Sequence, residues 1–126
     1  MNDRETQFPI FRRKDGFRLV FQKPIKASFK ILLLQGREVE SKEGTIEILD
    51  MSLTGAKVTT SLQIPARKTK IQLKCTINQE QMSMIGELIW EKESYKGNIY
   101  GMTFDPKSYS ERQLHTELKN YVKQHK

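Results

Sequence analysis

Between Thr45 and Thr60 the sequence reads TIEILDMSLTGAKVTT. Residues 45–50 and 56–60 are short runs rich in β-branched and aliphatic residues, which is typical of strands. The residues between them include Ser52, Thr54 and Gly55, which favour a break in the chain. The segment therefore predicts two strands separated by a polar turn.

Similar strand patterns recur on both sides of this segment. The first strong one begins at Ala27, and Lys23-Pro24 marks an extended approach to it, because the residue before a proline avoids helix. Apolar and polar residues alternate with a period of two in the patterns at 27–34, 45–50, 56–60, 70–75, 82–91 and 98–104. Six short strands at regular spacing favour a small antiparallel barrel or sandwich.

Only the end of the chain has a helical pattern. Ser110 stands three residues before Gln113, which is the spacing of a capping box. Leu114, Leu118 and Tyr121 then form one apolar stripe, so we expect a helix that closes the barrel or packs on a partner.

The length of 126 residues fits one domain, which we place at residues 11–124 after a flexible lead-in at residues 1–10. The longest aliphatic run has four residues, far below the roughly 20 needed to cross a bilayer. No signal peptide is visible, and the lone Cys75 excludes an internal disulfide. We therefore expect a cytoplasmic protein. Cys75, Trp90 and Tyr100 lie on strand patterns that favour core or barrel-mouth positions.

The sequence gives no sign of catalysis. It contains no phosphate-binding glycine loop, nucleophile elbow or zinc-binding H-E-x-x-H motif, and its two histidines have no ligand partners at suitable spacing. We expect no enzymatic activity, no metal and no cofactor.

Positive charge is concentrated before the first strong strand pattern. Residues 10–30 carry one acidic residue, Asp15, against seven basic ones, namely Arg12, Arg13, Lys14, Arg18, Lys23, Lys26 and Lys30. Such a segment attracts anions, and the planar guanidinium of arginine can both grip a phosphate and stack on a base. Charge of this kind can also serve only solubility.

Asp50, Ser52 and Gly55 form the most informative polar group. Two residues apart on an extended chain, Asp50 and Ser52 point to the same side, and Gly55 permits a positive φ or a close backbone approach. These three residues could contact the base or amine edge of a ligand, or could simply cap a tight turn.

The order of these features resembles that of the PilZ domain. Asp50-x-Ser52-x-x-Gly55 is similar to its D/N-x-S-x-x-G signature, and the stretch from Arg12 to Arg18 is similar to its R-x-x-x-R signature. The resemblance continues through residues 86–90, residues 100–104 and the closing helix, and covers residues 12–122.

The resemblance implies a mainly β fold, a six-stranded antiparallel PilZ-type β-barrel with a C-terminal α-helix. It further implies a non-catalytic bacterial receptor that binds cyclic di-GMP and relays it to a protein of the motility or exopolysaccharide machinery. Its arginines would hold phosphate and guanine faces from a basic N-terminal loop, and its Asp, Ser and Gly would contact a guanine. Carried over by position, the implied ligand-binding residues are Arg12, Arg13, Lys14, Arg18, Asp50, Ser52 and Gly55.

The sequence differs from the R-x-x-x-R signature at the first arginine. Lys14 stands four residues before Arg18, and Arg13 stands five before it. Either Arg13 serves through a one-residue bulge, or Lys14 serves as a point charge. A degenerate PilZ domain that binds only protein is the alternative, and a nucleic-acid-binding barrel is a third hypothesis that ranks last, because few aromatic residues accompany the charge.

Overall fold

The computed structural model describes residues 10–13 and 16–125, with the side chains described from Arg18 onward. The elements follow in the order β1 (Ile10–Arg13), β2 (Gly16–Leu34), β3 (Arg37–Glu38), β4 (Gly44–Ser52), β5 (Gly55–Thr60), β6 (Thr69–Thr76), β7 (Gln81–Ser94), β8 (Gly97–Phe104), a 3-10 helix η2 (Pro106–Ser108) and α1 (Glu111–Gln124).

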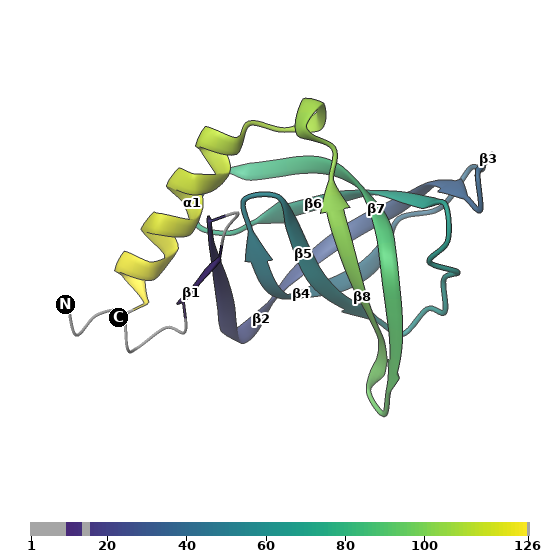
Figure 1. Ribbon diagram of the computed structural model, residues 1–126, viewed down its shortest axis with the longest axis horizontal. Helices are drawn as coiled ribbons and strands as arrows, with labels where there is room; N and C mark the ends of the chain where they lie inside the picture. The colour runs from purple at the N-terminus through teal and green to yellow at the C-terminus, as the bar shows by residue number, and fades with distance from the viewer. Residues whose placement is uncertain (1–9, 14–15, 126) are drawn as a thin grey trace.

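Six of the strands form a closed antiparallel barrel (Figure 1). Around the barrel the order is β2-β4-β5-β8-β7-β6, and the pairing of β2 with β6 closes it. Strands β1 and β3 lie outside this ring, and each pairs with β2. The predicted six-stranded barrel with a C-terminal helix is confirmed.

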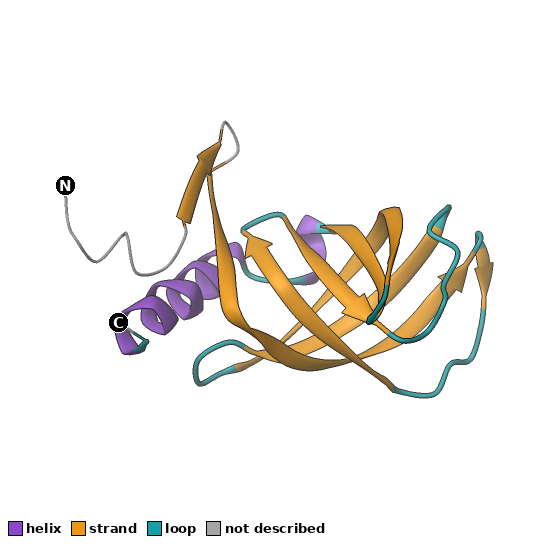
Figure 2. Ribbon diagram, turned by 90° about the horizontal axis from the view of Figure 1, so that it is seen from below, coloured by secondary structure: helices purple, strands orange, loops and turns teal. Residues whose placement is uncertain are grey.

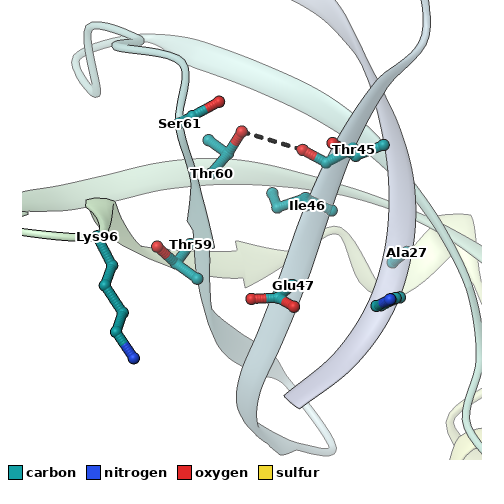
Figure 3. A pocket seen from close by; sticks show the side chains of 9 residues that line it. Ala27, Thr45, Ile46, Glu47, Thr59, Thr60, Ser61 and Lys96 are labelled. Carbon is teal, nitrogen blue, oxygen red and sulfur yellow. Dashed lines mark hydrogen bonds between the residues drawn. The ribbon is translucent and has the colours of Figure 1, made fainter.

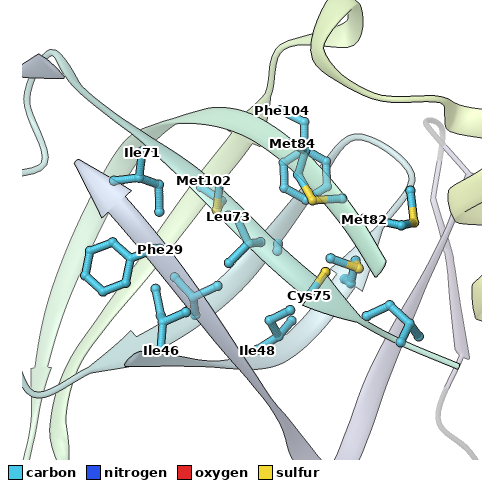
Figure 4. Packing of buried hydrophobic residues seen from close by; sticks show 14 of the residues in the cluster. Phe29, Ile46, Ile48, Ile71, Leu73, Cys75, Met82, Met84, Met102 and Phe104 are labelled. Atoms are coloured by element: carbon cyan, nitrogen blue, oxygen red, sulfur yellow. The ribbon is translucent and has the colours of Figure 1, made fainter. Parts of the chain in front are cut away.

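The inside of the barrel is filled by the apolar residues of the alternating patterns. In β6, Ile71, Leu73 and Cys75 are buried while the residues between them point outward. Phe29 from β2 and Ile46 and Ile48 from β4 meet them in the same core (Figure 4). The period of two in the sequence therefore reports correctly which side chains face inward.

Strand β2 is much longer than the sequence pattern predicts. It begins at Gly16 rather than at Ala27, so the segment expected to be a basic loop is a strand (Figure 2). Leu19 and Phe21 are buried on one side of it, and their burial against the core holds the segment extended. Residues 10–13, part of the same basic segment, form β1 and pair with residues 16–19.

The register of β2 against β4 shifts between Val20 and Ile25, where Pro24 lies. Proline lacks the N–H that a ladder requires, so an irregularity at this point is expected. The bend lets the first part of β2 pair with the end of β4, while its later part pairs with both β4 and β6.

Helix α1 lies across one end of the barrel (Figure 1). Ser110 is its N-cap and accepts from Gln113 N at 3.1 Å, as the capping pattern predicts. Leu114, Leu118 and Tyr121 are buried in the core, and the Tyr121 ring meets Phe21 edge-to-face at 5.2 Å. The helix therefore closes the barrel, one of the two roles expected for it.

Candidate functional site

Two β-bulges aim polar and aromatic side chains at one outer face. In β4 the register shifts between Ile48 and Asp50, and in β7 it shifts between Leu88 and Trp90. Ile48 and Leu88 point into the core, and the extra residue in each strand turns Asp50 and Trp90 outward. Both bulges therefore serve the same patch of the barrel surface.

Asp50 is the charged centre of this patch. Its Oδ1 accepts a short hydrogen bond from Arg18 Nη1, and its Oδ2 lies 3.4 Å from Lys57 Nζ. Only 6% of the Asp50 side chain is exposed, against 22% for Arg18 and 42% for Lys57. One buried carboxylate is thus held between two cations that both reach solvent.

Arg18 has donor capacity left over. Its Nε is buried and has no hydrogen-bond partner among the described residues. A buried donor without a partner costs about 1–3 kcal/mol. The guanidinium therefore keeps one N–H donor that no described residue satisfies.

Ser52 organises the turn between β4 and β5. Its Oγ accepts from Gly55 N at 3.1 Å and from Thr54 N at 3.2 Å, and it lies opposite Arg18 across the strand pair. The Ser52 hydroxyl also lies 3.4 Å from Thr54 Oγ1 and 3.4 Å from Gly55 O, and it can donate to either oxygen. The hydroxyl is used within the turn, which is the capping role considered above.

Gly55 is required by a close backbone approach. A Cβ added there would lie 2.5 Å from Met102 O on β8, closer than any real Cβ contact. Leu53 and Thr54 are held from the same side, because Tyr109 Oη donates to Leu53 O and Phe104 N donates to Thr54 O at 2.8 Å. The turn is thereby fixed against β8 and the segment that follows it.

An open hollow of about 290 Å³ lies on this patch of the barrel surface, lined in part by Arg18, Asp50 and Gly55. Small-molecule sites span roughly 300–1,000 Å³, so the hollow has room for part of a dinucleotide, such as one base with its phosphate. Its lining residues come from five strands and the β4–β5 turn, namely Arg18, Asp50, Thr54, Gly55, Ala56, Lys57, Ile89, Trp90, Gly101, Met102 and Thr103.

Trp90 is on the outside of the barrel, which corrects the expectation of a core or barrel-mouth position. It is 42% exposed, and its indole covers Gly101, where an added Cβ would lie 2.1 Å from Trp90 Nε1. The bulge at Ile89 is the reason, because it shifts Trp90 from the inward to the outward face. Tyr100, by contrast, is 0% exposed, in agreement with the expected core position.

Sequence reasoning therefore missed two residues of the site, Lys57 and Trp90. Lys57 stands opposite both Asp50 and Gly101, and Trp90 stands opposite Gly101 on the other side. The one indication in the sequence was the alternation in residues 56–60, which places the Lys57 side chain on the outer side of its strand. Nothing in the sequence marked the bulge that brings Trp90 to the same face.

The structure brings together Arg18, Asp50, Ser52 and Gly55, four of the seven predicted site residues. Arg12 and Arg13 lie in β1, where the backbone of Arg12 pairs with that of Phe17, but their side chains are outside the described part. Lys14 lies outside the described residues altogether, as do residues 1–9 of the expected lead-in.

A second hollow of about 360 Å³ lies farther along β4 and β5 (Figure 3). Its hydroxyl groups are largely committed to the fold, since Thr60 Oγ1 donates to Thr45 O at 3.0 Å and Thr59 Oγ1 donates to Asn98 O at 2.9 Å. Glu47 and Lys96 flank it, and neither forms an ion pair there among the described residues. We assign it no ligand.

Other reactive groups are remote from the hollow. Cys75 is buried in the core, and desolvation, followed by the nearby charge of Glu117, raises the pKa of its thiol to about 12.

In residues 10–13 and 16–125 no three His, Cys, Asp or Glu side chains gather as metal ligands. None of the helices in that part of the chain is long and apolar enough to span a membrane.

The comparison with protein families settles what kind of barrel this is. The model of the PilZ domain matches residues 12–124, nearly the whole chain. The chain belongs to the PilZ family. PilZ domains are cyclic di-GMP receptors rather than enzymes, and the family resemblance predicted from the sequence is confirmed. Searches among curated proteins and among solved structures found no match.

Proposed function

We propose that this PilZ domain is a non-catalytic receptor that binds cyclic di-GMP in the hollow beside Asp50. The observation that carries the proposal is the juxtaposition of Arg18, Asp50 and Lys57 next to an exposed Trp90. Two cations suit the phosphates of a dianionic nucleotide, the carboxylate suits the N–H edge of guanine, and the indole offers a face on which a base can stack.

Each residue has a stated role in this proposal. Arg18 binds phosphate through the Nη groups and stacks a guanine, Lys57 adds a point charge, and Asp50 accepts from guanine N–H groups. Gly55 allows the ligand and β8 to approach the turn closely, and Ser52 contributes by holding that turn in shape. Arg12, Arg13 and Lys14 add further positive charge from the β1–β2 segment.

The signal would follow from contacts with the basic segment that precedes the barrel. A nucleotide held between this segment and the hollow changes the surface that a partner meets. We propose that the domain, residues 11–124, works in the bacterial cytoplasm. It would pass the cyclic di-GMP signal on to a protein of the motility or exopolysaccharide machinery.

A degenerate PilZ domain that binds only protein is the second candidate. It is favoured by the observation that Asp50 already has two cationic partners and that the Ser52 hydroxyl is used inside its own turn. In that case the same groups would serve only to stabilise the barrel.

Calorimetric titration with cyclic di-GMP separates the two candidates. The receptor proposal expects saturable heat with the wild-type domain and a loss of about tenfold to a hundredfold in affinity for Arg18→Ala and Asp50→Asn, the cost of a charge-assisted hydrogen bond. Arg67→Ala, an exposed arginine outside the hollow, is the matched control and should bind as the wild type does.

A negative result is equally informative. At about 100 µM ligand, a site of micromolar affinity would stabilise the domain by about 2.7 kcal/mol. Neither heat nor a rise in melting temperature at that concentration would overturn the receptor proposal and leave the protein-binding module.

A further inference from the structure

The barrel carries a second charged face that the candidate nucleotide site does not use. In β2 the inward positions are Ala27, Phe29 and Ile31, so Lys26 and Lys30 point outward. In β6 the inward positions are Ile71, Leu73 and Cys75, so the outward ones include Lys70 and Lys74. We call these four lysines, Lys26, Lys30, Lys70 and Lys74, the lysine face.

The pairing of β2 with β6 merges the two rows of lysines. Ser28 stands opposite Lys74, and Lys30 stands opposite Gln72. Lys30 is therefore a diagonal neighbour of Lys74, at roughly 7–8 Å between backbones, and Lys26 precedes Ser28 by two residues on the same outward side of β2. The two strands therefore present their positive charges on one side of the barrel wall.

Carboxylates balance this face only at its margins. Glu47 stands opposite Lys26 and Glu87 stands opposite Lys70, both at the margins, while Lys30 and Lys74 have only uncharged residues opposite them. Among the described residues, none of the four lysines has an ion-pair partner within 4.0 Å. An anionic surface laid against the lysine face would relieve its repulsion.

The lysine face is also remote from the candidate nucleotide site. In the closed order β2-β4-β5-β8-β7-β6, the β2–β6 seam is opposite the β5–β8 seam, where Lys57 and Gly101 lie. Arg18 belongs to the first part of β2, which pairs with β4 rather than with β6. Both faces can therefore be occupied at once.

The composition of the face identifies the kind of surface it suits. Its uncharged members are Ser28 and Gln72, and it has neither the arginines and aromatic residues that dominate protein–protein hot spots nor the stacking platforms used for single-stranded nucleic acid. Lysine is a flexible point charge and is depleted at the cores of protein interfaces. Clustered lysines of this kind are attracted to anionic lipid headgroups.

We propose that the lysine face docks the domain on an anionic lipid surface, with the candidate nucleotide site directed away from the bilayer. Binding is electrostatic and peripheral. It depends on the density of negative lipid and weakens as salt shortens the range of the attraction.

Sedimentation with lipid vesicles tests the proposal. The wild-type domain should bind vesicles of phosphatidylglycerol and phosphatidylcholine at low ionic strength, should leave them in about 0.5 M salt, and should not bind phosphatidylcholine alone. Lys30→Glu combined with Lys74→Glu should lower the affinity by about tenfold or more, because each lysine near the surface contributes about fivefold.

The matched control is Lys107→Glu combined with Lys119→Glu. These two exposed lysines lie in η2 and α1, and their reversal changes the net charge by the same amount. The control should keep its affinity within about twofold of that of the wild type, since its charges lie off the lysine face. Melting temperatures verify that all variants are folded, and Lys30→Gln with Lys74→Gln replaces the reversal if that variant unfolds.

Three results would overturn the proposal. The wild-type domain could fail to bind anionic vesicles at low salt, or the control could lose as much affinity as the face variant, which would reduce the effect to net charge. Duplex DNA could bind as tightly as the vesicles at equal salt and be lost in the same variant, which would make the face a nucleic-acid site.

Discussion

Gly55 shows how closely single positions are specified in this barrel. Its missing Cβ would lie 2.5 Å from Met102 O, a backbone atom that cannot move without disturbing β8. Gly101 is also crowded, but by the indole of Trp90, an exposed side chain that can swing away. Replacement of either glycine by a larger residue therefore meets an obstacle, which is backbone at Gly55 and a side chain at Gly101.

Gly55→Ala should destabilise the domain by about 1–3 kcal/mol, the usual cost of overpacking. Gly101→Ala should cost less but should displace Trp90 and change its fluorescence. Urea denaturation measures the first effect and emission spectra the second. Equal destabilisation by both variants would contradict this account of the two contacts.

Ser52→Ala should cost about 1–3 kcal/mol, because the buried N–H of Gly55 and the partly buried N–H of Thr54 lose their acceptor. Thr54→Ala removes a nearby exposed hydroxyl whose only hydrogen bond to a described residue is the long one to Ser52. It serves as the control, with an expected change below about 0.5 kcal/mol. A stable Ser52→Ala variant in the same denaturation experiment would mean that the turn does not depend on this cap.

At the scale of elements, helix α1 is fastened to the barrel by one buried carboxylate. Glu117 Oε1 accepts from the backbone N–H groups of Asn78, Gln79 and Glu80, each at 3.0 Å. These three residues form the turn between β6 and β7. A single side chain thus joins the last element to the β6–β7 turn.

Glu117→Ala should destabilise the domain by about 2–3 kcal/mol, since three donors lose a charged acceptor. Glu117→Gln keeps one acceptor oxygen in the same place and should fall between the wild type and the alanine variant. Glu111→Ala, at the exposed start of the helix, is the control. Urea denaturation showing equal stability for Glu117→Ala and Glu111→Ala would remove the carboxylate from this role.

The sequence predicts the elements that have a regular period. The six strand patterns and the capped helix are at the expected places because burial on one side of each element leaves a visible alternation. The early part of β2 was missed although Leu19 and Phe21 alternate there, because the basic residues around them are also typical of a loop.

The candidate site was only half predictable for a related reason. Asp50, Ser52 and Gly55 are close in sequence, and Arg18 was found through the family signature. Trp90 depends on the bulge at Ile89, and a bulge reverses the face of every residue after it without changing the composition. Such a shift becomes visible only when the strands are paired.

At the scale of the whole molecule, the core thiol links stability to pH. Burial keeps Cys75 neutral in the folded state, where its pKa is raised from 9.0 to about 12. Above pH 9 the unfolded chain releases this proton and the folded chain does not. The contribution of the buried thiol to the free energy of unfolding is therefore complete below pH 9 and is lost as the pH rises toward 12.

The free energy of unfolding of the wild type should therefore fall by about 1 kcal/mol more than that of Cys75→Ala between pH 8 and pH 10. The buried tyrosines titrate in both proteins and cancel in the comparison. Denaturation at the two pH values measures the difference. Parallel losses of stability in both proteins would show that the thiol is not protected by burial.

The domain as a whole places its single tryptophan beside the charged hollow, and this makes the central claim directly measurable. Titration of Trp90 fluorescence with cyclic di-GMP should give a saturable change in the wild type, shifted to at least about tenfold higher concentration in Asp50→Asn. An emission spectrum unchanged up to about 100 µM ligand, more than enough to fill a micromolar site, would contradict binding of the nucleotide in this hollow.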